Sequence, residues 1–87
     1  MYELIIEKRV IKSLSKIHTN DREKIKKAIS NLASNPFPKG CIKLKGLKDN
    51  RYRIPVGNFR IAYEVRKKEL VILILKVGTR ESFYNGL

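Results

Sequence analysis

The chain has 87 residues, 43% of them hydrophobic, which suffices for one compact domain with one core and excludes a multidomain protein. Twenty Lys and Arg residues against eight Asp and Glu residues give a net charge of +12. Residues 1–38 carry eight basic and four acidic residues, a net of +4, whereas residues 39–87 carry twelve and four, a net of +8, so a polyanion is expected to bind the second half.

The first half of the chain predicts one strand and two helices. Residues 2–7 are apolar-rich and partly β-branched, as is typical of a strand. Two amphipathic helices follow, separated by the polar residues 18–20. Asn20 with Glu23 three residues later resembles a capping box and predicts where the second helix begins, and Asn35-Pro36 ends it. The apolar positions of the two helices are Val10, Ile11, Leu14 and Ile17, then Ile25, Ala28, Ile29, Leu32 and Ala33.

Gly57-Asn58 predicts the turn of a tight β-hairpin, because the first position of such a two-residue loop needs a positive φ. Alternation along the strands then puts one set of side chains into the core and the other on an open face. On that face Arg53 and Arg60 become diagonal neighbours, roughly 7–8 Å apart, so both can contact one phosphate. The predicted pairs are Val56 with Phe59, Pro55 with Arg60, Ile54 with Ile61, Arg53 with Ala62, Tyr52 with Tyr63 and Arg51 with Glu64.

Three further features complete the predicted sheet. Ile42-Lys43-Leu44-Lys45 alternates apolar and basic residues and opens the second strand region. Pro55 has no N–H for a ladder, so the strand over residues 51–56 is expected at the sheet edge. Residues 70–75 are all apolar, the pattern of a central strand. We therefore predict an α+β fold in the order β-α-α-β-β-β, with an N-terminal helical hairpin packed on a small, mainly antiparallel four-stranded sheet.

Few residue types are available for chemistry. Cys41 has no disulfide partner, and His18 forms no recognised zinc-site spacing with it, so no metal or cofactor is expected. The arginines with Tyr84 fit metal-free cleavage of RNA by its own 2′-hydroxyl, a reaction that needs a base, cations for the phosphorane and an acid for the leaving oxygen. Arginine supplies such cations well. No apolar run reaches the roughly 20 residues of a membrane span, and no signal-peptide pattern is present, so we expect a cytoplasmic protein.

Three segments, in combination, resemble the RelE/ParE toxin superfamily and its RelE-like mRNA interferase branch. They are Lys43-Leu44-Lys45-Gly46-Leu47, the run from Tyr52 through Arg53-Ile54-Pro55-Val56-Gly57-Asn58-Phe59-Arg60 to Tyr63, and Val77-Gly78-Thr79-Arg80 followed by Tyr84. The resemblance spans residues 1–87 as one toxin domain. It implies a toxin of a type II toxin–antitoxin system, a ribosome-dependent mRNA endoribonuclease that its cognate antitoxin neutralises in a hetero-oligomer.

Carried over residue by residue, the resemblance implies catalytic roles for Arg53, Arg60, Arg80 and Tyr84. Among the other basic residues of the second half, we expect RNA binding by Lys43, Lys45, Lys48 and Arg51. The structural alternative for Arg60 and Arg80 is an ion pair with Glu64 or Glu81, and for Arg51 it is an ion pair with Glu64.

Pro55 departs from the pattern of the superfamily. It stands where the best-known RelE enzymes carry a second lysine, thought to help protonate the leaving oxygen. The loss of one general acid corresponds to a rate roughly 10²–10⁴ lower, or about 3–5 kcal/mol of barrier. Lys45, Lys48 and Lys76 are the candidates to replace it. Two other functions stay open: a ParE-like toxin that inhibits DNA gyrase, and a catalytically weakened relative that binds RNA or the ribosome.

Overall fold

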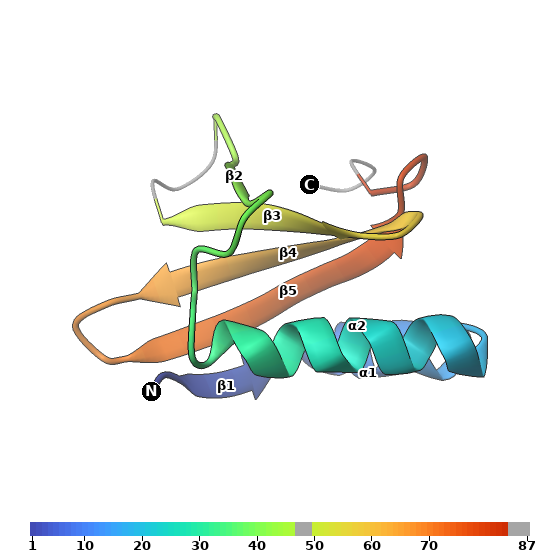
Figure 1. Ribbon diagram of the computed structural model, residues 1–87, viewed down its shortest axis with the longest axis horizontal. Helices are drawn as coiled ribbons and strands as arrows, with labels where there is room; N and C mark the ends of the chain where they lie inside the picture. Colours follow the sequence, from blue (N-terminus) through green and yellow to red (C-terminus); the bar gives the residue numbers. More distant parts are fainter. Residues whose placement is uncertain (47–49, 84–87) are drawn as a thin grey trace.

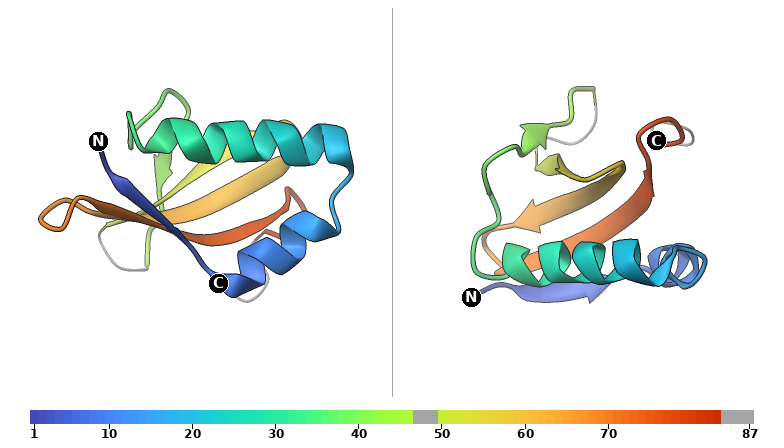
Figure 2. Two further views of the ribbon diagram at one scale, coloured as in Figure 1. Left: turned by 90° about the horizontal axis from the view of Figure 1, so that it is seen from below. Right: turned by 45° about the vertical axis from the view of Figure 1, so that its right-hand side comes forward.

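The structure, a computed structural model, describes residues 1–46 and 50–83, so the predicted site residues Lys48 and Tyr84 lie outside the described residues. Five strands form one sheet in the order β1-β5-β4-β3-β2, with β1 parallel to β5 and the other pairs antiparallel. Both helices lie on one side of this sheet, as Figures 1 and 2 show. The elements are β1 (Glu3–Ile6), α1 (Lys8–Ser15), α2 (Thr19–Leu32), β2 (Ile42–Lys43), β3 (Arg51–Val56), β4 (Phe59–Arg66) and β5 (Val71–Thr79).

The predicted α+β fold is confirmed, but the sheet has five strands instead of four. The additional strand is β2, whose two residues pair with Tyr52 and Arg53 of β3. The strand β3 is therefore the edge only beyond Arg53, and Pro55 lies in that part, where β4 is the only described strand that pairs with it. This position agrees with the missing N–H of proline. The apolar strand β5 lies inside the sheet, as predicted, between β1 and β4.

Each helix buries one side against the sheet. The start of α2 differs from the prediction. Ile25, Ile29 and Leu32 of α2 are buried, whereas Ile11 of α1 is 57% exposed although it belongs to the predicted apolar stripe. The predicted capping box was wrong. His18 is the N-cap of α2, and its Nδ1 accepts a 3.3 Å hydrogen bond from the backbone N–H of Asn20. The helix begins at Thr19.

The hairpin of β3 and β4 has the predicted register at every pair from Val56 with Phe59 back to Arg51 with Glu64. Gly57 has a φ of +59°, as the turn requires. Leu70 was predicted to begin a strand, but it is the last residue of the β4–β5 turn, with a φ of +56° and 53% of its surface exposed. A positive φ strains a residue with a Cβ, so this turn stores conformational energy.

Both faces of the sheet carry hydrophobic clusters, although the face away from the helices was predicted to be open. The larger, helix-side cluster joins the helices to residues such as Ile54, Tyr63 and Ile74. Because the tail after β5 folds back over the sheet, it brings Phe83 onto the other face (Figure 1). The smaller cluster there, called the tail-side cluster below, consists of Leu44, Ala62, Leu75 and Phe83.

A β-bulge in β5 sets which of its side chains reach the tail-side face. Ala62 of β4 pairs with Lys76, but the next residue, Tyr63, pairs with Ile74, so Leu75 is the extra residue. Paired residues share a face, and a bulge shifts the alternation by one. Lys76 therefore shares the face of Ala62, while Val77 returns to the helix-side cluster.

Candidate functional site

Three cations lie around Ala62 on the face of the sheet opposite the helices. Arg53 of β3 pairs with Ala62, and Ala62 pairs with Lys76 of β5, so these residues form one row across three strands. Arg60 pairs with Gly78 in the next row and is thus a diagonal neighbour of both cations, with backbones about 7–8 Å apart. Arg53, Arg60 and Lys76 are half-buried, and we call them the cationic face.

The Arg60 side chain folds toward the turn of its own hairpin. Its Nη1 donates hydrogen bonds to the carbonyl oxygens of Phe59, at 3.0 Å, and of Gly57, at 3.3 Å. The structural alternative for Arg60, an ion pair with Glu64, is not formed, because Glu64 bonds Arg51 and Arg66 instead. The guanidinium of Arg60 is therefore held near the turn by neutral carbonyl groups, which leave its positive charge available to an anion.

The tail after β5 is fastened to the same turn. The backbone N–H of Arg80 donates a 2.7 Å hydrogen bond to the carbonyl oxygen of Asn58, and that of Phe83 donates one of 2.8 Å to Thr79. The hydroxyls of Thr79 and Ser82 accept hydrogen bonds from each other's backbone N–H, both at 3.2 Å. A pocket lined by Asn58, Thr79, Arg80 and Glu81 lies between turn and tail. The exposed Arg80 is thereby brought beside the hairpin that carries Arg60.

Gly78 permits this close approach of the tail. A Cβ at this position would lie 3.2 Å from Ser82 Oγ and in ordinary contact with Phe83 Cα at 3.5 Å, so any other residue would require the Ser82 side chain to shift by a few tenths of an ångström. Phe83 itself is fully buried in the tail-side cluster. The segment between them, which includes Arg80, is thus held at both ends.

Lys76 differs electrostatically from an ordinary surface lysine. Burial lowers its pKa, and the nearby positive charge of Arg9 lowers it further. Arg9 is held at this place because its Nε donates a 2.7 Å hydrogen bond to the carbonyl oxygen of Leu75. A lysine with a lowered pKa gives up its proton more readily, which suits a general acid.

The other predicted RNA-binding residues lie apart from the cationic face. Lys43 pairs with Tyr52, so its side chain is on the same face as Tyr52, the face opposite the cationic face. Lys45 is exposed in the turn after β2. Arg51 is on the same face as Arg53 but near the far end of the hairpin, where its Nε donates to Glu64. The structure therefore brings together Arg53, Arg60 and Arg80 and leaves these residues outside the group.

The sequence indicates Lys76 only as one of three substitutes for the lysine missing at Pro55. Its position on the cationic face depends on the bulge at Leu75. In a run where every residue is apolar, the sequence pattern does not reveal such a bulge. The sequence likewise places Arg66, the second partner of Glu64, only in a turn. One signal could have found it, since residues 64 and 66 share a face in any regular strand.

The described residues contain no group of three or more His, Cys, Asp or Glu side chains that could hold a metal ion. Within the same residues, none of the helices is both long and apolar enough to cross a membrane.

The fold is shared with RelE-type toxins. A chain of the archaeal RelE–RelB complex from Pyrococcus horikoshii matches with a TM-score of 0.81 at 32% identity, over 91% of this chain and 94% of that chain. The RelE1 protein of Methanocaldococcus jannaschii is 36% identical over 98% of this chain and 97% of its own length. The mRNA interferase toxin RelE of Escherichia coli is 27% identical over 92% of this chain and 84% of its own length.

The model of the family described as ParE-like toxin of type II bacterial toxin–antitoxin system matches residues 4–87, and the chain belongs to this family. Its predicted membership of the RelE/ParE toxin superfamily is thereby confirmed.

Proposed function

We propose that this toxin cleaves messenger RNA on the ribosome, through attack of the RNA 2′-hydroxyl on the neighbouring phosphate and without a metal or cofactor. The observation that carries the proposal is the hydrogen bond from Arg80 to Asn58, because it joins the tail arginine to the turn beside Arg60. Two arginines whose backbones flank the same turn are proposed to bring their guanidinium groups to one phosphate, where they suit the charge of a phosphorane. The E. coli relative is named an mRNA interferase, which supports the same activity here.

In this proposal each residue has a separate part. Arg60 and Arg80 bind the phosphate oxygens, and Arg53, a diagonal neighbour of Arg60, adds a third cation. Tyr84 follows the buried Phe83 in the sequence and is proposed to contact the RNA near the reacting phosphate. Lys76 protonates the leaving 5′-oxygen, the task for which Pro55 has no group, while the proton of the attacking 2′-hydroxyl passes to solvent water. Its lowered pKa and its place beside Arg60 in the register support this assignment.

We further propose that a cognate antitoxin binds this toxin in a hetero-oligomer, since the Pyrococcus horikoshii relative was solved as a RelE–RelB complex. A pocket between β1, α1 and α2 offers a surface for it. Apolar side chains including Ile6, Ile11 and Ile29 line this pocket, with Arg22 and Lys26 beside them. An acidic amphipathic segment of the antitoxin complements both the apolar side chains and the positive charge. The proposed target, the translating ribosome, puts the protein in the cytoplasm.

Purified toxin added to ribosomes programmed with a defined message tests the proposal. We expect cuts in the message that disappear with Arg80→Ala. The control is Lys24→Gln, which also removes one positive charge, but from an exposed position on α2, and should cut normally. An intact message at saturating toxin contradicts the proposal. If DNA breaks trapped on gyrase appear instead, the protein acts as a ParE-like gyrase inhibitor.

A further inference from the structure

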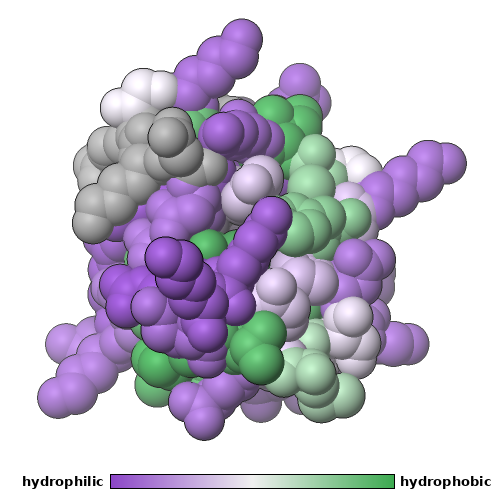
Figure 3. All heavy atoms as spheres, turned by 90° about the vertical axis from the view of Figure 1, so that its left-hand side faces the viewer, coloured by the Kyte–Doolittle hydropathy of each residue, from purple (hydrophilic) through white to green (hydrophobic). Residues whose placement is uncertain are grey.

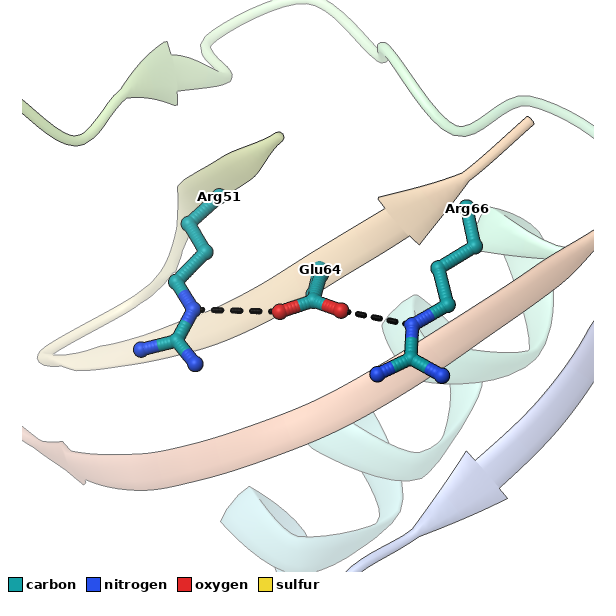
Figure 4. Close-up of polar contacts among 3 residues, drawn as sticks. All are labelled: Arg51, Glu64 and Arg66. Carbon is teal, nitrogen blue, oxygen red and sulfur yellow. Dashed lines mark hydrogen bonds and ion pairs between the residues drawn. The ribbon is translucent and has the colours of Figure 1, made fainter. Parts of the chain in front are cut away.

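A buried carboxylate holds two arginines at the end of the hairpin far from the Gly57-Asn58 turn. Glu64 is only 3% exposed, and its Oε1 accepts a hydrogen bond from Arg51 Nε at 3.2 Å while its Oε2 accepts one from Arg66 Nε at 2.7 Å. Figure 4 shows the three side chains in a line, with Glu64 between the arginines. Burial alone raises the pKa of the Glu64 carboxyl, but the two arginines outweigh it and keep the pKa below its usual range. The carboxylate is therefore charged.

This arrangement leaves donors available for an anion. Both contacts with Glu64 use Nε, and Figure 4 shows the terminal nitrogens of the two guanidinium groups on the same side of the carboxylate. Two guanidinium charges against one carboxylate leave a net charge of +1. The Arg51 side chain is 28% exposed and that of Arg66 is 48% exposed, so an anion in solution can reach both. Because Glu64 orients the arginines in advance, less side-chain entropy is lost when they bind.

The surroundings add positive charge and an aromatic surface. Arg66 leads into the β4–β5 turn with Lys67 and Lys68, and these residues line a pocket with Asn50 and Tyr52. Lys67 Nζ lies 5.3 Å from the centre of the Phe37 ring, and Phe37 packs edge-on against Tyr52. Figure 3 looks onto this end of the molecule, where hydrophilic side chains cover much of the surface. Tyr52 packs with Tyr63 on the helix side of the sheet, whereas Arg51 and Glu64 are on the other face. The rings therefore border the site only at the β4–β5 turn, where Arg66 and the turn lysines adjoin them.

We propose that Arg51 and Arg66, oriented by Glu64, form a second phosphate-binding site that takes the backbone of an RNA strand. The choice of RNA rests on the proposed function. Register supports it, because Arg66 lies six positions along β4 from Arg60 on the same face, which corresponds to about 20 Å. One RNA strand of several nucleotides can therefore follow β4 and contact both places. This site binds the strand and takes no part in the cleavage chemistry.

Binding to an RNA that cannot be cut separates this site from catalysis. The probe is a fluorescent oligonucleotide with 2′-O-methyl groups, titrated with the full chain without ribosomes between about 50 and 200 mM KCl. For single strands, the slope of log K against log salt becomes shallower by about 0.7 for each phosphate that the protein no longer neutralises. We expect this decrease for Arg51→Gln and for Arg66→Gln, and about twice this decrease for both together. Lys24→Gln should leave the slope unchanged.

Glu64→Gln distinguishes orientation of the arginines from their charge alone. The substitution makes the protein more positive, so charge alone would strengthen binding, whereas a loss of orientation should weaken it severalfold. Glu69→Gln makes the same change in charge at an exposed position of the neighbouring turn and should strengthen binding slightly. If Glu64→Gln does not fold, the arginine variants decide.

The site is overturned if the arginine variants keep the wild-type salt slope, or if Lys24→Gln lowers it equally. It is also overturned if the arginine variants bind RNA normally but lose affinity for the antitoxin, which would make this end a protein-docking surface. A failure of message cleavage leaves the inference intact, because the probe carries no 2′-hydroxyl. Conversely, if the arginine variants keep the wild-type salt slope while message cleavage still depends on Arg80, the second phosphate-binding site is refuted and the proposed function stands.

Discussion

The backbone N–H of Arg80 lies 2.7 Å from the carbonyl oxygen of Asn58 and joins the tail of the chain to the turn of the central hairpin. This hydrogen bond is made by main-chain atoms, so it sets the position of Arg80 whatever its side chain does. The side chain can then be substituted without moving the backbone that presents it. Loss of cleavage in Arg80→Ala would therefore report on the guanidinium itself.

Gly78→Ala tests whether close packing holds the tail in place. The added Cβ meets Ser82 Oγ at 3.2 Å and forces it to shift, which disturbs its hydrogen bonds with Thr79, and a lost hydrogen bond costs about 0.5–1.5 kcal/mol. We expect the free energy of unfolding, measured in urea, to fall by this amount. Thr79→Ser keeps the hydroxyl that Ser82 uses and serves as the control. Wild-type stability in Gly78→Ala would show that the tail can shift at no cost.

Lys76→Met tests the proposed general acid while keeping an unbranched side chain. We expect the single-turnover rate of message cleavage on ribosomes to fall by roughly 10²–10⁴. Because the pKa of Lys76 is lowered, the wild-type rate should decline on the alkaline side at a lower pH than for an ordinary lysine, and this decline should vanish in the variant.

Adding Pro55→Lys to Lys76→Met provides a rescue for the same prediction. Pro55 is exposed next to Arg60 in the register, so a lysine there can reach the same phosphate. Partial recovery of the rate is expected. If Pro55→Lys alone accelerates the wild type as strongly as it accelerates Lys76→Met, then Lys76 is not the acid.

Glu64 should make the stability of the protein dependent on pH. Its pKa in the folded state is below that of the unfolded chain, so its ionised form stabilises the fold above the unfolded value, and this contribution is lost as the pH falls through the folded value. Glu64→Gln should cost about 1.5–3 kcal/mol at neutral pH. It should also lose less stability on acidification than the wild type. Urea unfolding at neutral pH and near pH 3 measures both effects. If wild type and Glu64→Gln lose the same free energy of unfolding between neutral pH and pH 3, the stabilising role of the ionised Glu64 is contradicted.

Leu70 offers a stabilising substitution. Its φ of +56° is costly for a residue with a Cβ, and its side chain is more than half exposed. Leu70→Gly should therefore be more stable than Leu70→Ala by about 1 kcal/mol, since both variants remove the side chain and only glycine removes the strain. The midpoints of urea unfolding decide, and equal midpoints would mean that the turn is not strained.

The hairpin could be predicted in detail because its determinants are local. Gly57-Asn58 fixes the turn, and a two-residue turn fixes the register of every pair behind it. Arg53 and Arg60 could thus be placed on one face from the sequence alone. The helices could be predicted for the same reason, since periodicity within one segment reports the side that is buried.

The rest depended on packing between distant segments. The bulge at Leu75 is determined by packing on two sheet faces, and an uninterrupted apolar run does not reveal where the alternation shifts. Phe83 covers Ala62 only because the tail folds back, which turned the predicted open face into a second cluster. At the start of α2, His18 took the capping role from Asn20 because the helix begins two residues earlier than the capping box suggests.

The parallel pairing of β1 with β5 has a consequence for synthesis of the toxin. Residues 3–6 find their partners only in residues 71–74, so loops of almost the whole chain must close before the sheet is complete. Pairing across such a high sequence separation slows folding. While the chain is still being made, neither β5 nor the tail arginine is available to complete the cationic face. The cationic face is therefore complete only after residues 71–80 have been synthesised and β5 has paired with β1 and β4.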